Sequence, residues 1–316
     1  MIQNTLKYQR GRALHLLHSI EGLTVKQACA KLGVSYHNGR RCKHIYLTNT
    51  EPNMIAFDEE TYTGRTDKIV IPVYDGHQEI EGDAIVIGDV HLPTTNWQIA
   101  EWVYLVGKST GIKTLLIVGD LLNMDAFSYY PPVVPEISFE TEKVAARRLL
   151  ARYATHFDRI ILSLGNHEKR YLKSKRGMLT MDELMSEITD ENSRNNFVAS
   201  PYPYMTVVSG GVDWHVTHPR NYSRIKGRLG DTLAQKHQTN VILLHQHHVS
   251  KSMDTFCRYV VIDGGGLFDA KKMAYVALED GNNPVMCNGF VVLRGGIGHL
   301  ITPYSAFTDL AKWGLK

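Results

Sequence analysis

Five short apolar runs of this 316-residue chain each end in a side chain that can bind a metal ion. Runs of this kind, separated by segments with helical spacing of apolar residues, are typical of strands that alternate with helices. The five runs cover residues 84–89, 114–120, 159–166, 213–218 and 240–245. The sequence therefore predicts an α/β fold whose sheet is buried on both faces.

The segments between and after these runs complete the expected fold. Apolar residues at helical spacing predict helices over 96–109, 140–156 and 181–188. A run at 68–76 indicates a short additional strand. Further strands joined by glycine turns are expected at 259–266, 273–278 and 288–302.

Metal-binding side chains gather where the predicted strands end. In open α/β sheets, ligands bind beyond the carboxyl ends of the strands, so these side chains are expected to meet. Taken in chain order, they are Asp89 and His91, then Asp120, then Asn166 and His167, then His218, and finally His245 and His247.

The chemistry of this set indicates the metal. Imidazoles with carboxylates and an amide oxygen suit Mn²⁺, Fe or Zn²⁺, whereas pure oxygen coordination would favour Mg²⁺ or Ca²⁺. The set exceeds the four ligands of one tetrahedral ion. We therefore expect two divalent ions, with Mn²⁺ first and Fe, Zn²⁺ or Mg²⁺ as alternatives. Two ions about 3.5–4 Å apart can clamp a phosphate and activate a hydroxide for in-line attack.

Five ordered blocks resemble the motifs of the calcineurin-like metallophosphoesterase superfamily. They are GDVH (88–91), GDLLN (119–123), GNHE (165–168), the THP that contains His218, and HQH (245–247). The resemblance covers residues 83–305 and implies a β-sandwich of mixed sheets flanked by helices, with the site at one edge. One departure is Leu244, which stands where the family usually has glycine.

The resemblance also implies a role for each residue. Asp120 would bridge the two metals. His167 would bind no metal, but would stabilise charge on the phosphate and act as general acid to the leaving oxygen. Glu168 or Asp125 would orient His167. The first metal would be held by Asp89, His91 and His247, and the second by Asn166, His218 and His245.

The N-terminal residues differ from the rest in charge. Residues 1–50 contain eight Lys and Arg against one acid, Glu21, which gives +7 in a chain of net charge +3. Three helices are expected there, the second capped by Thr24 and joined to the third through residues 32–35, as in a helix-turn-helix. A self-associating helical module would show the same spacing. In the DNA-binding case, the residues that face DNA would be Ser35, His37, Asn38, Arg40, Arg41 and Lys43.

Three parts of the chain are thus expected: a basic module at 1–49, a linker with a first strand at 50–82, and a phosphoesterase domain at 83–316. The four cysteines are scattered and form no CxxC pair, which indicates reduced thiols. No signal peptide or membrane span is visible, so a cytoplasmic protein is expected. The chain also resembles metallophosphoesterases of bacteriophages, which would place it in the host cytoplasm. A homo-oligomer fits a helix-turn-helix.

Basic runs follow two of the predicted site loops and bear on the substrate. Arg170 belongs to the run after GNHE and Arg220 to the run after His218, and both suit a phosphate backbone. The aromatic and proline-rich segment 127–139 suits either a rim on which a base stacks or a cover for the sheet.

Three functions follow from these features. The first is a DNA nuclease or phosphodiesterase targeted by the helix-turn-helix. The second is a phosphoesterase acting on a small nucleotide, a cyclic nucleotide or a phosphoprotein. The third is a DNA-binding regulator with a non-catalytic phosphoesterase domain, against which the complete ligand set argues.

Overall fold

The computed structural model divides the chain into two compact units, Met1–Val73 and Tyr74–Lys316. The residues that the structure describes are 11–18, 23–34, 74–128, 134, 137–174, 179–278, 285–305 and 307–315.

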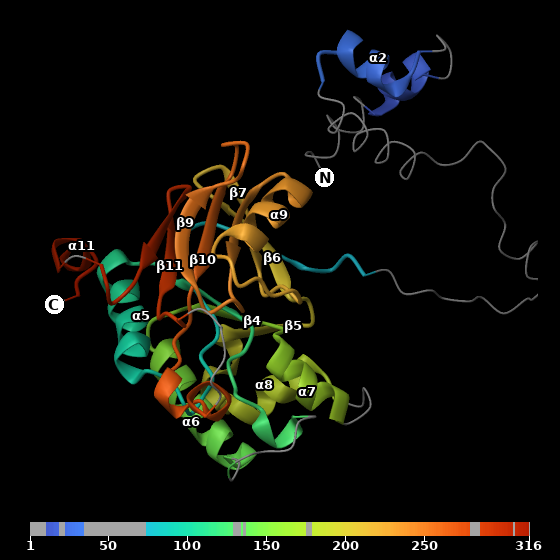
Figure 1. The fold of residues 1–316 in the computed structure, drawn as a ribbon. Coiled ribbons are helices and arrows are strands. Elements are labelled where there is room, and N and C mark those ends of the chain that lie inside the picture. The colour runs from blue at the N-terminus through green and yellow to red at the C-terminus, as the bar shows by residue number, and fades with distance from the viewer. Residues whose placement is uncertain are drawn as a thin grey trace, which may run out of the picture. The chain divides into compact units, whose positions relative to one another are not determined.

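The larger unit contains two six-stranded sheets (Figure 1). The strands of the first sheet are β2 (Ala84–Ile87), β3 (Thr114–Val118), β4 (Arg159–Ser163), β5 (Phe197–Ser200), β11 (Phe290–Arg294) and β12 (Ile297–Ile301). The strands of the second are β1 (Gln78–Glu81), β6 (Tyr204–Ser209), β7 (Val212–Thr217), β8 (Asn240–Leu243), β9 (Val249–Met253) and β10 (Val260–Gly264). Their spatial orders are β12-β11-β2-β3-β4-β5 and β1-β6-β7-β8-β10-β9. Both sheets mix parallel and antiparallel pairs, which confirms the predicted fold class.

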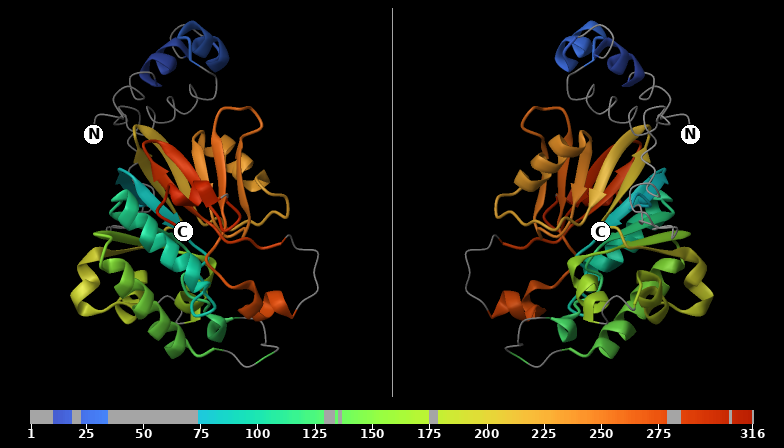
Figure 2. Two further views of the ribbon diagram at one scale, coloured as in Figure 1. Left: turned by 90° about the vertical axis from the view of Figure 1, so that its left-hand side faces the viewer. Right: turned by 90° about the vertical axis from the view of Figure 1, so that its right-hand side faces the viewer.

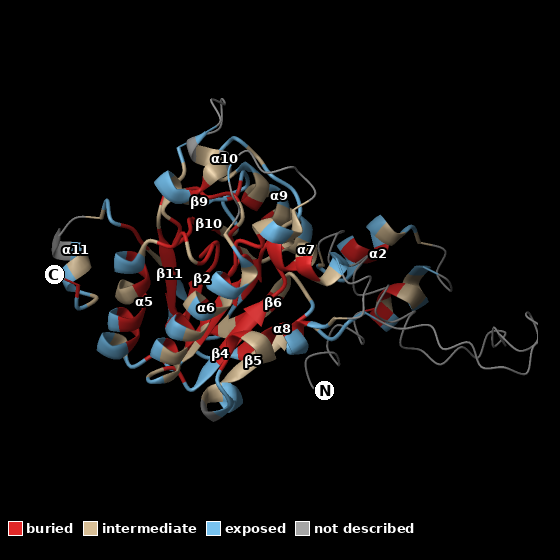
Figure 3. Ribbon diagram, turned by 90° about the horizontal axis from the view of Figure 1, so that it is seen from below, coloured by how far each residue is buried: buried red, intermediate tan, exposed pale blue. Residues whose placement is uncertain are grey.

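The two sheets pack face to face around a shared apolar core (Figure 2). Side chains alternate along each strand, so Val86 of β2 faces the other sheet while its neighbours Ile85 and Ile87 face the helices. Across the sandwich, Trp214 and Ile242 complete this core. Both faces of the central strands are therefore buried, as Figure 3 shows, and this explains their uninterrupted apolar sequences.

Helices cover the outer faces of both sheets. The first sheet is covered by α5 (Trp97–Thr110), α6 (Phe139–Ala154) and α8 (Met181–Ile188), which begin after the capping side chains of Asn96, Ser138 and Thr180. On the second sheet, α9 (Arg228–His237) buries Ala234 against β8 and β10. The helices predicted over 96–109, 140–156 and 181–188 are thus confirmed. The ends of α5 and α6 differ from the prediction by one or two residues, and α8 has the predicted bounds. The remaining helices are α7 (Asn166–Ser174), α10 (Ala274–Ala277), α11 (Phe307–Ala311) and the 3₁₀ turns η1 (Asp125–Phe127), η2 (Glu191–Asn196) and η3 (Ala270–Lys272).

Two of the predicted strands are not seen as predicted. The strand predicted over 273–278 is wrong, because that segment forms the single helical turn α10. A short apolar run does not distinguish a strand from a buried helical turn. Of the strand expected at 68–76, residues 68–73 lie outside the described part and residues 74–76 form no helix or strand. The edge strand β1 begins at Gln78 and pairs in parallel with β6.

In the smaller unit, residues 11–18 and α2 (Val25–Lys31) are helical. Thr24 caps α2 in a capping box with Gln27, and Leu14 packs with Ala28 and Cys29. The third predicted helix lies outside the described residues. The same is true of the predicted DNA-contact residues Ser35, His37, Asn38, Arg40, Arg41 and Lys43. The helix-turn-helix therefore stays a prediction.

No helix in the described ranges has the length and apolar character needed to cross a membrane. Cys29, Cys257 and Cys287 are not joined in disulfide bonds, and Cys42 lies outside those ranges.

Candidate metal centre

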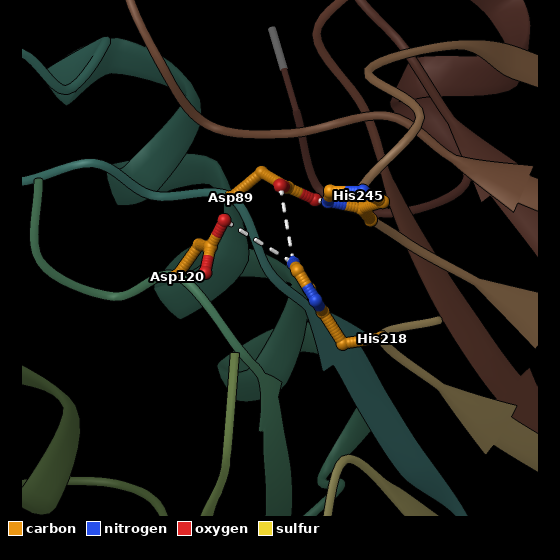
Figure 4. A group of neighbouring side chains, drawn as sticks. All are labelled: Asp89, Asp120, His218 and His245. Carbon is orange, nitrogen blue, oxygen red and sulfur yellow. Dashed lines mark hydrogen bonds and ion pairs between the residues drawn. The ribbon is translucent and has the colours of Figure 1, made fainter. Parts of the chain in front are cut away.

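The strand ends bring the predicted ligands together at one edge of the sandwich. The strands β2, β3 and β4 run parallel in one sheet and β7 and β8 run parallel in the other, so the loops that follow them converge. The side chains form three groups, and within each group the potential ligand atoms all lie within 4.8 Å of one another. These groups are Asp89, Asp120, His218 and His245 (Figure 4), then Asp89, His91 and His247, and then His91, Asp120 and His167.

The two carboxylates are held in the same way. Oδ2 of Asp89 accepts the backbone N–H of His245 at 2.7 Å, which leaves Oδ1 at 3.0 Å from His247 Nε2 and 3.5 Å from His218 Nε2. Oδ1 of Asp120 accepts the backbone N–H of His167 at 2.9 Å, which leaves Oδ2 at 3.3 Å from His218 Nε2. Each carboxylate therefore keeps one oxygen for the protein and aims the other at the imidazoles.

Several buried atoms at this edge fit metal ligation. Oδ1 of Asn166 and Nε2 of His218 are buried and have no hydrogen-bond partner within the described residues. The Nε2 atoms of His91 and His247 face each other at 3.4 Å. A buried polar atom without a hydrogen bond is costly, and two ring nitrogens that face each other suit a shared cation. One cation beside Asn166 and His218 and a second beside His91 and His247 would satisfy these atoms. The Asp and His clusters thus fit a dinuclear divalent metal site.

The backbone is strained at five of the seven predicted ligands. Each of these five has a positive φ although it is not glycine, with values between 47° and 76°. They are Asp89, His91, Asp120, His245 and His247. Such conformations cost about 1–3 kcal/mol each and persist where the surrounding structure enforces them, typically at functional sites. Here the strain turns each side chain from the strand end toward the common centre.

Leu244, the departure from the family motif, has a structural compensation. Its side chain is buried in the sandwich core, and it occupies the space beside Gly88 and Gly264. A Cβ atom at Gly88 would come within 2.9 Å of Leu244 Cγ and 2.6 Å of the Val118 carbonyl oxygen. The extra side chain at 244 is therefore accepted because two neighbouring positions have none.

Asn123 is a residue of the site to which sequence reasoning gave no role. Its side-chain oxygen accepts the Nδ1–H of His91 at 3.2 Å, and its backbone oxygen accepts the Nδ1–H of His167. Both rings therefore present Nε2 to the centre. The hydrogen bond to His167 is thus made by neither Glu168 nor Asp125, the two carboxylates expected from the sequence. Asp125 acts on the two histidines indirectly, because it accepts the side-chain N–H of Asn123, which in turn holds His91 and His167.

Two buried glutamates hold the loop that carries Asp120 and Asn123. Glu168 accepts the backbone N–H groups of Asp120, Leu121 and Leu122 at 2.9, 2.8 and 3.3 Å. Glu142, on α6, accepts that of Met124 at 2.9 Å. Burial raises the pKa of Glu142 to about 8 and, with the nearby charge of Asp120, that of Glu168 to about 7. Loop position therefore depends on carboxyl groups that bind no metal.

The ionisable groups of the centre perturb each other strongly. Burial opposes the charged form of His218, but Asp120 and Asp89 outweigh it and raise its pKa to about 10. Burial and the neighbouring His218 lower the pKa of His245 to about 4. Burial also lowers the pKa of His167 to about 3. Because a metal needs the unprotonated ring, ion binding at His218 would release a proton near neutral pH.

The other expected contacts lie around this centre. Arg170 lies 3.9 Å from Asp125, and Arg220 is exposed. Of the segment 127–139, the two end residues Phe127 and Phe139 pack with Tyr171 as part of the core, so they act as cover rather than as an open rim. Residues 129–133 and 135–136 lie outside the described part.

A family model describes the same region of the chain. The model of the calcineurin-like phosphoesterases matches residues 84–289, which include all of the predicted ligands. The chain belongs to this family. As a calcineurin-like phosphoesterase with clustered ligands, it is a metal-dependent hydrolase of phosphate esters. No curated protein sequence is significantly similar to it.

Several solved structures are similar to part of this chain. Yfce, a phosphoesterase from E. coli, is 13% identical over 67% of this chain and 87% of its own, with a TM-score of 0.36. Vps29 from Chaetomium thermophilum is 12% identical over 67% of this chain and 83% of its own, with a TM-score of 0.36. Vps29 from Entamoeba histolytica, solved with zinc, is 13% identical over 69% of this chain and 97% of its own, with a TM-score of 0.33.

Metal content tests the assignment of roles. Asp120→Ala removes a carboxylate that is grouped with His218 and His245 on one side and with His91 on the other, so we expect it to lose both ions. His167→Ala should keep both, because its Nδ1 is held by the protein and its role is toward substrate. Metals bound per chain would be measured by mass spectrometry after dialysis. Asp158→Ala, at an exposed position, serves as the control. Retention of both ions by Asp120→Ala would contradict the assignment.

The buried Glu142 predicts a pH-dependent stability. Its folded pKa of about 8 lies above the ordinary value of 4.5 for a glutamate, so the folded state holds one more proton between these values. Its contribution to the free energy of unfolding should therefore fall by about 1.4 kcal/mol per pH unit as the pH rises through this window. Urea unfolding of wild type and Glu142→Gln at pH 5, 6, 7 and 8 measures the difference. A difference that does not change with pH would refute this reading.

Proposed function

We propose that the chain is a two-metal phosphodiesterase that cleaves DNA. One observation supports a polyanionic substrate: cations from two separate segments, helix α7 and the loop after β7, lie close to each other. Lys169 follows His167 on α7, and Arg220 follows His218 after β7. Burial and the charges of Lys173 and Arg220 lower the pKa of Lys169, so these side chains are close enough to repel each other. Like charges that converge in this way favour the binding of phosphate groups.

The residues of the centre divide the catalytic work. Two bound ions, Mn²⁺ in our proposal, would supply Lewis-acid chemistry and a nucleophile at neutral pH. Asp89, His91 and His247 would hold one ion, and Asn166, His218 and His245 the other, with Asp120 between them. The Nδ1–H of His167 is anchored on Asn123, so its Nε2 is directed to the substrate and can protonate the leaving oxygen. A bound phosphate anion would favour the protonated ring, against the effect of burial.

The N-terminal module would deliver the enzyme to DNA. The support is its charge of +7 over residues 1–50, together with a helix that is capped at Thr24 and ended near Gly33. In this proposal Asn38, Arg40 and Arg41 meet base edges and phosphates, with Ser35, His37 and Lys43 beside them. A small nucleotide, a cyclic nucleotide or a phosphoprotein remains the alternative substrate, and a DNA-binding regulator the alternative of another class.

Cleavage of end-labelled DNA tests the proposal. Metal-stripped protein should cut single- or double-stranded DNA only after Mn²⁺ is added, and Asp120→Ala should cut neither. An Arg40→Ala/Arg41→Ala variant should lose DNA cutting but keep hydrolysis of bis(p-nitrophenyl) phosphate. If wild type hydrolyses that small diester and leaves DNA intact, the DNA proposal is wrong. Metal-dependent DNA binding without hydrolysis of either compound would favour the regulator.

His167→Ala isolates the proton transfer. Removal of a positioned general acid should slow turnover by about 10²–10⁴-fold. The loss should be smaller for a diester whose leaving group is a good one, since such a group needs no proton. Turnover of bis(p-nitrophenyl) phosphate and of a dinucleotide would be compared between the variant and wild type. Equal losses on both would argue against the acid role.

A further inference from the structure

The loop at 219–227, which follows the predicted ligand His218, is fixed by one side chain from the opposite ligand loop. Gln246 lies between His245 and His247 and is 3% exposed. Its Nε2 donates to the backbone oxygen of Asn221 at 3.0 Å, and its Oε1 accepts the backbone N–H of Ser223 at 2.7 Å. The Gln246 amide thus forms the same pair of hydrogen bonds that a neighbouring peptide group would form. Tyr222 lies between the two residues, Asn221 and Ser223, whose backbone groups are bonded.

The far end of the same loop is fixed as well. Asp263 on β10 accepts the backbone N–H of Gly227 at 2.7 Å and the hydroxyl of Ser250 at 2.8 Å. Burial raises the pKa of Asp263, which is 2% exposed. Two buried polar side chains therefore hold a loop whose own residues at 220, 222 and 224 are exposed.

The ring of Tyr222 lies beside the metal centre and remains accessible. Its centroid is 6.4 Å from that of His245, with the rings nearly perpendicular at 87°, and 6.1 Å from that of His248. The residue is 46% exposed. One edge of the ring is therefore set against the ligand loop while a large part of it is open to a substrate that reaches the metals.

We propose that Tyr222 is the subsite on which an aromatic group of the substrate stacks, a nucleobase next to the scissile phosphate. The proposal rests on the phosphodiesterase function proposed above. A half-exposed ring on a loop that also carries the exposed Arg220 and Arg224 matches the combination by which proteins hold single strands, in which stacked bases alternate with paired phosphates. Since every base has a flat face, this subsite would select for the presence of a base and not for its identity.

A purely structural role for Tyr222, as a cover over His245, makes a different prediction. Tyr222→Leu keeps an apolar side chain of similar reach but removes the flat face, whereas Tyr222→Phe keeps the face and removes the hydroxyl. A cover would tolerate leucine, and a stacking surface would not. The pair of variants therefore separates the two roles without disturbing any proposed metal ligand.

The test compares the dinucleotide TpT with its counterpart that lacks both bases, in the presence of Mn²⁺, by chromatography of the products. Tyr222→Leu should reduce kcat/KM for TpT by about 5- to 100-fold, mainly through KM, because stacking contributes on that scale. It should leave the base-free compound unchanged, and Tyr222→Phe should behave as wild type on both. No loss with Tyr222→Leu, or an equal loss on both compounds, would overturn the proposal.

Further substrates identify the source of the base and separate this inference from the proposed function. A loss on TpT that extends to single-stranded DNA points to a polynucleotide, and a loss on TpT that is absent for single-stranded DNA points to a small nucleotide. If wild type cuts no diester, the proposed function fails by itself. Tyr222 is then tested on phenyl and methyl phosphate by release of inorganic phosphate. An equal effect of Tyr222→Leu on these two monoesters would overturn the stacking role as well.

Discussion

The structure depends on two carboxylates, Asp89 and Asp120, buried among imidazole rings at one edge of a β-sandwich. A buried carboxylate is costly unless it is paired and hydrogen-bonded. Here each one is fixed by a backbone N–H of another site loop and faces ring nitrogens with its second oxygen. Those two N–H groups belong to His245 and His167, so the same bonds that satisfy the carboxylates also bring the site loops together.

The β-sandwich positions the loops that carry these carboxylates and histidines, and it stabilises their strained backbone. Strand ends from two sheets meet at one edge, and the left-handed backbone at five of the predicted ligands turns their side chains inward. The cost of that strain is offset by the core beneath, which is apolar on both faces of each sheet. Glu168 and Glu142 then fix the loop after β3 through its backbone N–H groups.

The sequence predicted those features of the fold and the site that depend on a recognisable pattern of residue types. Apolar runs that end in Asp, Asn or His gave the central strands and the residues that gather at their ends. The sequence did not reveal contacts made by backbone groups. The hydrogen bond from His167 to the backbone carbonyl of Asn123 is one example, since every residue has such a carbonyl. Nor did the sequence reveal the role of Glu142, which lies on the next long helix, 18 residues after Met124, and bonds back to the loop. The strand predicted at 273–278 failed because a run of six residues carries too little periodicity.

Membership of the calcineurin-like phosphoesterases accounts for the metal chemistry, while the loop held by Gln246 and the cations around it bear on the substrate. If one pair of carboxylates organises two ions, diffraction at the manganese absorption edge from crystals grown with Mn²⁺ should locate both. We expect two anomalous peaks about 3.5–4 Å apart, both beside Asp120 and only one beside Asn166. A single peak, or peaks away from Asp120, would contradict this expectation.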